Sequence, residues 1–481
     1  MALISRPCLP ALPALLALAA LAAACGDPFI SDDTASGGGP PGCSGAELPC
    51  AGACVDPLTN PLHCGACDSP CAEPDVCSSG VCAPPSCPDG LADCDDDPAN
   101  GCEVDLRADP DHCGTCTTAC FASCTEAACA TPVHLSAGAQ YTCAVLSDGA
   151  AWCWGRNAWG NLGDGTKDDR PTPTRVLLTS PAVAIAAGRD AGRTHTCAVL
   201  ADARVACWGA GSSGQLGTGG TSDALSPLIV DPLPAARRVA VGGAHTCAVT
   251  DADALLCWGQ GASGQLGNDS MDDQSSPVAV TSNVADLDAG LVHTCARMTN
   301  GAVRCWGANF AGQLGLGSNQ PAQHPIEILN LSGVARVALG LMHTCALTAA
   351  GAVSCWGEGS FYRLGTGSVT DALDPTPIDL PAIAWIALGT RHSTAVTRAG
   401  DVFAWGDNTL GQLGDGTADT AQTPIAIPLS GVESTAVGED HTCAVTTAGE
   451  ILCWGDNAHG QLGDGTTDAH PTPAPVQFPR D

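Results

Sequence analysis

The chain has 481 residues, of which 50 are Asp or Glu and 18 are Lys or Arg, so its formal net charge is -32 at pH 7. A chain this acidic is repelled by phosphate backbones and by anionic lipid headgroups, which argues against nucleic-acid binding. Thirty cysteines do not suit a reducing cytosol and favour an exported protein with disulfides.

The first 24 residues have the composition of a signal peptide. Arg6 gives a short positive region, and residues 9–24 form an apolar run that is too short for a membrane-spanning helix. The sequence around Cys25 resembles a bacterial lipobox, in which the cysteine becomes the acylated first residue of the mature chain. Because Ala22 stands where such motifs more often carry Leu, conventional signal cleavage stays open as an alternative.

A flexible linker and two cysteine-rich modules follow. Residues 25–42 are rich in Gly, Pro and Ser and predict a lipid-anchored linker. Residues 43–86 and 87–130 repeat one pattern of eight cysteines each, and modules of this size need disulfides to fold. The sequence leaves the connectivity of these sixteen cysteines open.

Two metal sites are alternatives in this region. His63-Cys64 and its second copy at His112 offer zinc ligands, while Asp93 begins an acidic run that resembles part of a calcium loop. That run lacks the later Glu of an EF-hand. Since export and the even cysteine count favour disulfides, we predict no metal and no cofactor, with calcium as the alternative.

A unit of about 50 residues then recurs seven times over residues 131–481. Each copy contains a Pro-bounded strand, a strand ending in Gly, a Cys strand, a Cys-Trp-Gly strand and a Gly-rich loop. Four short strands in each of seven units predict an all-β, seven-bladed β-propeller preceded by small disulfide-rich modules.

Six of the seven copies carry two cysteines ten residues apart. These cysteines face each other across an antiparallel hairpin and lie within disulfide reach, although buried thiols are the alternative. The remaining copy has lost both cysteines together, with Thr394 and Ala404 in their places, as a bonded pair would. The predicted disulfides are Cys143-Cys153, Cys197-Cys207, Cys247-Cys257, Cys295-Cys305, Cys345-Cys355 and Cys443-Cys453.

The motifs Gly-x-x-His-Thr, Trp-Gly-x-Asn and Gly-Gln-Leu-Gly resemble the repeats of the regulator of chromosome condensation family, over residues 131–481. The resemblance implies a seven-bladed propeller, whereas it is far less specific for activity. Family members include a nuclear exchange factor for a small GTPase, ubiquitin-ligase modules and secreted bacterial propellers, one of which inhibits β-lactamases. The paired cysteines depart from the usual pattern, as we expect of an exported bacterial variant.

The two ends of the repeat region predict how the ring closes. The first copy starts at Val133 without a Pro-Val strand of its own, while residues 475–478 form such a strand with no copy after it. We expect this C-terminal strand to complete the first blade, which removes an open sheet edge.

Histidine and tryptophan recur in the repeats. A residue present in every blade is spread around the ring, whereas catalysis needs unlike groups that converge, so we predict structural hydrogen bonding and inter-blade packing. The histidines, replaced by Tyr141 in the first copy, are His195, His245, His293, His343, His392 and His441. The tryptophans are Trp154, Trp208, Trp258, Trp306, Trp356, Trp405 and Trp454.

One irregular loop, residues 358–365, is the best candidate for a binding site. It departs from the Gly-Gln-Leu-Gly of its siblings, and exposed aromatics and arginines anchor interfaces, although loop packing is the alternative for each residue. With two aromatics from equivalent loops, the candidates are Trp159, Phe310, Phe361, Tyr362 and Arg363.

We expect an exported, lipid-anchored and monomeric propeller of the cell envelope, outer membrane or cell surface, or otherwise a secreted one. It would bind a protein or glycan partner, contact the membrane only through its anchor and carry no catalytic residue. The alternatives, in order, are an inhibitor of an exported enzyme such as a β-lactamase, a carbohydrate-active hydrolase and a guanyl-nucleotide exchange factor. A sialidase-like site needs a nucleophilic Tyr, and the chain has only Tyr141 and Tyr362.

Overall fold

The computed structural model describes residues 43, 47–50, 53–72, 76–83, 87–92, 94, 102–117, 120, 123–190 and 192–479. Cys25, the linker and the acidic run that begins at Asp93 lie outside these ranges, apart from Cys94. The chain divides into two compact units, residues 1–86 and 87–481. Within the described ranges, no helix has the length and apolar character needed to cross a membrane.

The two cysteine-rich modules consist of short two-stranded hairpins. In the first unit these are β1 (Leu48–Cys50) with β2 (Ala53–Val55) and β3 (Val76–Ser78) with β4 (Val81–Ala83). The second module has β5 (Leu91–Ala92) with β6 (Val104–Asp105) and β7 (Cys124–Thr125) with β8 (Ala128–Cys129).

Both modules have the same disulfide connectivity, joining the first cysteine to the third, the second to the fifth, the fourth to the seventh and the sixth to the eighth. The first module contains Cys43–Cys54, Cys50–Cys67, Cys64–Cys77 and Cys71–Cys82. The second contains Cys87–Cys102, Cys94–Cys116, Cys113–Cys124 and Cys120–Cys129. Two sets of three cysteine sulfurs lie close enough to share a metal ion, but all six are in disulfides and offer no thiolate to zinc.

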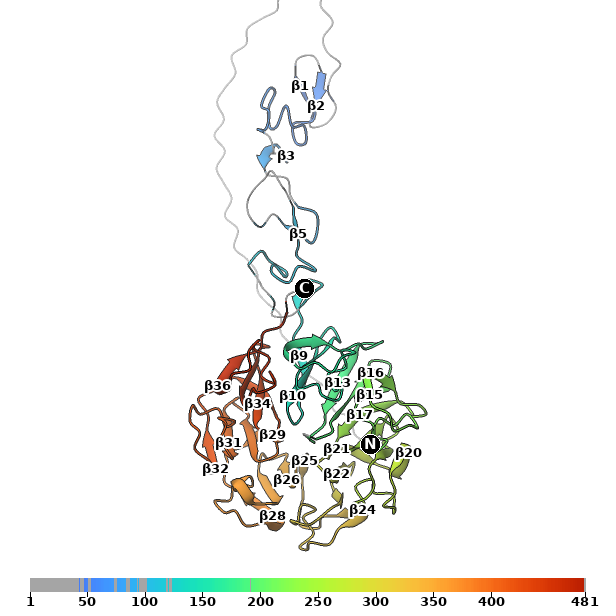
Figure 1. Ribbon diagram of the computed structural model, residues 1–481. Coiled ribbons are helices and arrows are strands. Elements are labelled where there is room, and N and C mark those ends of the chain that lie inside the picture. The colour runs from blue at the N-terminus through green and yellow to red at the C-terminus, as the bar shows by residue number, and fades with distance from the viewer. Residues whose placement is uncertain are drawn as a thin grey trace, which may run out of the picture. The chain divides into compact units, whose positions relative to one another are not determined.

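The propeller contains seven antiparallel four-stranded sheets, called here blades one to seven in chain order (Figure 1). The first strands, which line the central channel, are β9 (Pro132–Ala137), β13 (Ala182–Ala187), β17 (Ala236–Val241), β21 (Val284–Ala289), β25 (Val334–Leu339), β29 (Ile383–Leu388) and β33 (Val432–Val437). The second strands are β10 (Tyr141–Leu146), β14 (His195–Leu200), β18 (His245–Thr250), β22 (His293–Met298), β26 (His343–Thr348), β30 (His392–Thr397) and β34 (His441–Thr446).

The third and fourth strands complete each blade. The third strands are β11 (Ala151–Gly155), β15 (Val205–Gly209), β19 (Leu255–Gly259), β23 (Val303–Gly307), β27 (Val353–Gly357), β31 (Val402–Gly406) and β35 (Ile451–Gly455). The fourth strands are β12 (Arg170–Arg175), β16 (Ala224–Ile229), β20 (Gln274–Thr281), β24 (Ala322–Glu327), β28 (Ala372–Ile378), β32 (Ala421–Ala426) and β36 (His470–Pro475). These outer strands are rich in Pro, which lacks the N–H of a central strand and is tolerated at a sheet edge.

The expected closure of the ring was wrong. The C-terminal strand β36 pairs with β35 in blade seven, while blade one is complete with its own β12. The Pro-bounded strand closes the blade that precedes it in the chain rather than opening the next one. Blades seven and one, red and teal in Figure 1, instead meet through side chains: the Phe478 ring packs edge-on against Trp152, with ring centroids 5.5 Å apart.

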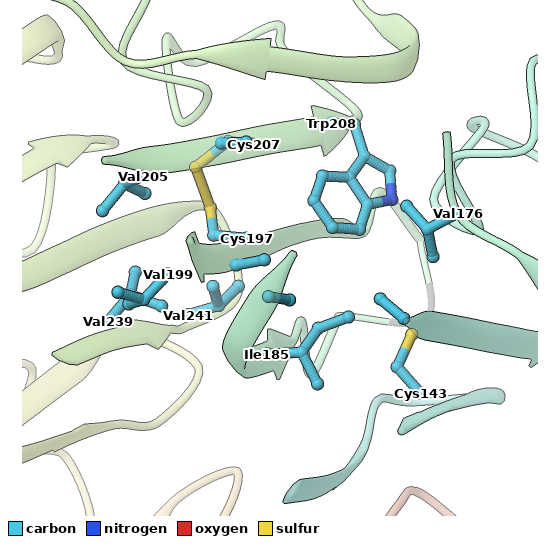
Figure 2. Close-up of a cluster of buried hydrophobic side chains, with 14 of the residues drawn as sticks. Cys143, Val176, Ile185, Cys197, Val199, Val205, Cys207, Trp208, Val239 and Val241 are labelled. Atoms are coloured by element: carbon cyan, nitrogen blue, oxygen red, sulfur yellow. A yellow bond between two sulfur atoms is a disulfide. The ribbon is translucent and has the colours of Figure 1, made fainter. Parts of the chain in front are cut away.

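The hydrophobic core lies between neighbouring blades. All six residues of β14 are buried, because this strand is covered by a blade on each side. Figure 2 shows Trp208 beside Val176 at one such boundary, and Val199 facing Val239 of the next blade. Neighbouring blades therefore bury each other's apolar side chains.

All six predicted hairpin disulfides are present in the structure. Cys143 is the register partner of Cys153, and the Cα atoms of each pair are 4.1 Å apart. In blade six, Thr394 and Ala404 are register partners at the same place. There the Thr394 hydroxyl lies 2.7 Å from the hydroxyl of Thr435 in blade seven, so a hydrogen bond between blades replaces the covalent bond.

Candidate functional site

The propeller has two faces, and both ends of its chain lie on the same one. Pro132, where the chain enters blade one, pairs with Leu146 at the end of β10, and Pro475 pairs with Leu452 near the start of β35. The opposite face, called here the loop face, carries the short turn between strands one and two and the long loop between strands three and four. In blade one these are residues 138–140 and 156–169. The chain therefore enters and leaves the propeller on the face opposite the loop face.

A repeated set of buried hydrogen bonds joins consecutive blades beneath the loop face. The His195 Nε2 atom lies 2.7 Å from the Thr246 hydroxyl of the next blade, and Thr246 donates to the Gln215 carbonyl oxygen. Trp258 donates its indole N–H to that same carbonyl oxygen at 2.9 Å. His441 reaches Thr142 in the same way at 2.9 Å, so the belt also crosses from blade seven to blade one.

The belt explains the recurring histidines. Each Thr or Ser hydroxyl gives its single proton to a carbonyl, so it accepts from the histidine, which must carry its proton on Nε2. Burial lowers the pKa of His195 to about 3 and of His245 to about 4, which keeps both rings neutral. Tyr141 takes the same place in blade one and its hydroxyl lies 2.8 Å from the Thr196 hydroxyl. These side chains hold the ring together and are spread around it rather than gathered into a reactive site.

The loop after each third strand contains glycines at positions where a side chain would collide with a neighbouring blade or where φ is positive. A Cβ atom at Gly163 would lie 2.6 Å from Trp208 Nε1, and Gly160 has a φ of +76°. Tyr362 occupies the position of Gly160 in blade five and has a φ of 60°, while Phe361 before it has a φ of 59°. Two consecutive bulky residues in the left-handed region cost free energy, and such strain is concentrated at functional sites. The short 3₁₀ turn η1 (Ser360–Tyr362) contains both residues.

Arg363 lies inside this loop and not on the surface. Its guanidinium pairs with Glu358 at 2.6 Å, and its Nε donates to the Ser360 carbonyl oxygen at 2.9 Å. Its own carbonyl accepts from Trp405 at 2.8 Å, as the Gln carbonyl does in sibling loops. Burial lowers the pKa of Arg363. The guanidinium therefore holds the loop together and is not presented to a partner.

The loop face carries an arc of exposed apolar side chains on three consecutive blades. Phe310 is 67% exposed, Phe361 46% and Leu410 42%. Phe361 and Leu410 occupy the same loop position, in blades five and six, and Phe310 lies one position earlier in the loop of blade four. We call these three residues the apolar arc. Sequence reasoning missed Leu410, which an alignment of the loops would have found, since it occupies the same loop position as Phe361 and Trp159.

Trp159 lies apart from the arc, in blade one. Its indole N–H donates to the Gly192 carbonyl oxygen at 2.7 Å, and the Arg193 guanidinium lies 4.5 Å from its ring centroid. Both partners belong to the extra residues 189–194 of blade two. Trp159 therefore packs against that insertion, and the structure does not bring it together with Phe310 and Phe361.

Acidic groups border the arc at blades six and seven. Arg391, whose guanidinium lies 5.2 Å from the Phe361 ring centroid, pairs with Asp407 at 3.8 Å and with Asp440 at 3.5 Å. Burial raises the pKa of Asp440 to about 6 and also raises the pKa of Glu439. Buried carboxyls with raised pKa values are more common at binding sites than on open surfaces. The arc thus has an arginine within it and an acidic border.

Comparisons with protein families match the repeat region and the N-terminal region separately. The regulator of chromosome condensation (RCC1) repeat matches residues 148–199, 202–249 and 253–297, and a second model of this repeat matches residues 133–160 and 236–265. The RCC1-like domain matches residues 278–481. The stigma-specific STIG1-like protein family matches residues 21–84.

Curated relatives match short parts of the chain. The human E3 ubiquitin-protein ligase HERC2 is 34% identical over 101 residues, which cover 21% of this chain and 2% of HERC2. The ultraviolet-B receptor UVR8 of Arabidopsis thaliana is 38% identical over 106 residues, which cover 21% of this chain and 23% of the receptor. The chain therefore spans less than a quarter of the length of either relative.

Two solved structures share the fold. Prp20p from Saccharomyces cerevisiae, described with its binding to Gsp1p and histones, has a TM-score of 0.61 at 23% identity, over 68% of this chain and 85% of that one. Human WBSCR16 has a TM-score of 0.62 at 23% identity, over 69% of this chain and 94% of that one. At this identity the likeness concerns the fold alone.

Proposed function

We propose that this chain, which carries a seven-bladed propeller of RCC1 repeats, binds a protein partner through its loop face. RCC1-like propellers are a protein-binding fold, and Prp20p is one that binds proteins. The observation that supports this face is the apolar arc, because large exposed apolar side chains on consecutive blades mark interaction surfaces. We propose no catalytic step.

The partner should present an apolar patch next to basic side chains. The arc would supply the buried centre of the interface, and Phe361, near the guanidiniums of Arg363 and Arg391, would be its middle. The acidic border and the net charge of -32 attract a basic partner and repel an acidic one. A glycan partner would instead need exposed polar groups beside the aromatic rings.

The test compares two surfaces of the same chain. Phe310→Ser, Phe361→Ser and Leu410→Ser in one variant remove the apolar arc, while Leu329→Ser removes an apolar side chain that is 85% exposed on the opposite face. The full-length proteins serve as bait for cell-envelope extracts. Proteins captured by the wild type and by the Leu329 variant, but not by the triple variant, support the proposal. A partner retained by all three overturns it.

We also propose export with a lipid at Cys25, in a bacterial cell envelope. The fourteen disulfides within the described residues support an oxidising compartment. The sequence before Cys25 supports the lipid. Mass spectrometry of the mature N-terminus tests this: an acylated Cys25 is expected, and an unmodified N-terminus at another residue contradicts it.

A further inference from the structure

The central channel is a cavity of about 430 Å³ lined by the first strands of the blades. The third residues of these strands occupy one register position around the wall, called here the channel ring. They are His134, Ala184, Arg238, Asp286, Arg336, Trp385 and Ser434. Two residues further along, the same strands contribute mainly Ala, so the side chains with functional groups gather in the ring.

The channel has an excess of positive charge inside an acidic protein. Arg189, Arg237, Arg238 and Arg336 line it, against two carboxylates, Asp288 and the Asp286 of the channel ring. Three of the arginines have carboxylate partners within the described residues: Arg238 pairs with Asp286 at 2.6 Å, Arg237 with Asp253 at 2.6 Å and Arg189 with Asp288 at 3.8 Å. Arg336 has no carboxylate within 4.0 Å among those residues.

Arg336 is held in a fixed position by an aromatic ring. Its guanidinium lies 3.6 Å from the ring centroid of Trp385, and Trp385 is fixed by donating its indole N–H to the Thr435 carbonyl oxygen at 2.9 Å. The Nε atom of Arg336 is buried and has no hydrogen-bond partner in the described structure. Burial, with the nearby charge of Arg238, lowers the pKa of Arg336 to about 10. A largely buried charge that is not paired with a carboxylate is costly, and an anion would compensate for it.

One end of the channel is crossed by a side chain. Arg189 extends from blade two and donates to the Leu388 carbonyl oxygen of blade six at 2.6 Å. Leu388 ends β29 on the loop face, and Gly188 follows β13 on the same face. Arg189 therefore lies across the loop-face end, and a ligand would enter from the opposite face.

We propose that the central channel binds a small organic or inorganic anion with a carboxylate or phosphate group, which pairs with Arg336 inside the channel ring. The guanidinium fork matches the oxygens of either group, and stacking on Trp385 leaves the edge of the guanidinium free to donate. The Ser434 hydroxyl and the His134 imidazole belong to the same ring and offer further hydrogen bonds. The cavity volume suits a small molecule rather than a polypeptide segment.

The site is separate from the apolar arc, which lies on the loop face beyond Arg189. Anion binding in the channel therefore does not depend on the proposed function. The triple variant that lacks the arc should bind the anion as the wild type does, so the two proposals can fail independently.

Isothermal titration calorimetry of the full-length protein tests the proposal, with citrate and inorganic phosphate as separate probes at low salt. Arg336→Gln should weaken binding of the preferred probe about tenfold or more, because it removes the charge. The control, Arg304→Gln, removes an arginine of β23 that pairs with Glu327 of β24 at 3.6 Å, and should bind like the wild type. The two probes show whether carboxylate or phosphate is the better ligand.

A second variant separates binding from folding. Arg336→Lys keeps the charge and loses the fork, so it should fold like the wild type and bind more weakly. Absence of heat with both probes at millimolar concentration overturns the proposal. Equal affinity of the wild type and a folded Arg336 variant also overturns it.

Discussion

Thr394 and Ala404 face each other across the hairpin of blade six, at the position where every other blade has a disulfide. The Thr394 hydroxyl is hydrogen-bonded to Thr435 of blade seven instead. Blade six therefore exchanges a bond within the hairpin for a bond to its neighbour. The local stability of blade six should therefore depend on the next blade more than the local stability of any other blade does.

Restoring the cysteines in blade six should stabilise the protein. Closing a loop of this length by a disulfide contributes about 2–3 kcal/mol, and losing the Thr394 hydrogen bond costs about 1 kcal/mol. The Thr394→Cys/Ala404→Cys variant should thus gain about 1–2 kcal/mol in urea unfolding without reductant. The single Thr394→Ala variant should instead lose about 1 kcal/mol. A double variant that forms the disulfide but is no more stable would contradict the interpretation.

The hairpin of blade six should open more often than those of its siblings. Hydrogen-exchange mass spectrometry should find faster exchange in residues 392–406 than in residues 343–357, the equivalent hairpin of blade five. Both hairpins contain a buried His and a buried Trp, so the cysteines are their main difference. Equal protection of the two segments would show that inter-blade packing alone sets local stability.

Stability should fall as the pH is lowered from about 6.5 towards 4. Burial lowers the pKa of His195, His293 and His392 to about 3. Below the ordinary pKa of histidine, these side chains therefore take up protons in the unfolded chain but not in the folded one. Each of these histidines should lower the free energy of unfolding by about 2 kcal/mol at pH 5. Asp440 and Glu439 act in the opposite sense, because burial raises the pKa of both, to about 6 for Asp440, but they are fewer than the buried histidines.

The measurement is urea unfolding at a series of pH values. His293→Gln should be less stable at pH 7, because the hydrogen bond to Thr344 is disturbed, yet its stability should depend less steeply on pH. A pH slope identical to that of the wild type would mean that His293 does not remain neutral in the folded protein.

Replacing Tyr362 by Gly should leave the protein folded and about 1 kcal/mol more stable, because glycine adopts a φ near 60° without strain. If the strained turn serves binding, the same variant should capture less partner in the envelope assay. The matched control is Gly312→Ala, at the equivalent position in blade four, where a Cβ would lie 2.8 Å from the Leu373 Cα atom. That control should be less stable. A less stable Tyr362→Gly protein would show that the tyrosine packs favourably despite its backbone.

The repeated positions of the chain were predictable, and the unique ones were not. The spacing of Cys143 and Cys153 predicts their pairing because a hairpin register depends only on local sequence. The place of the Pro-bounded strand does not follow from sequence, since it lies between two blades and can pair with either.

Unique residues act through contacts that spacing does not encode. Arg363 resembled an exposed anchor, but its pairing with Glu358 depends on the fold of the loop. The channel ring was missed because its members are far apart in the chain. An alignment of the first strands would have revealed it, as the one position where Arg238, Arg336 and Trp385 interrupt small or apolar residues.

The contacts of Phe478 with blade one have a consequence for the order of the chain. Blades seven and one are joined by a contact between His441 and Thr142, of the same kind as the His–Thr contacts between other blades, and they share no strand. The ends of the propeller chain could therefore lie between any two blades. A permuted gene for residues 131–481 that joins the two ends of the propeller and begins at residue 182, the start of β13, should encode the same propeller.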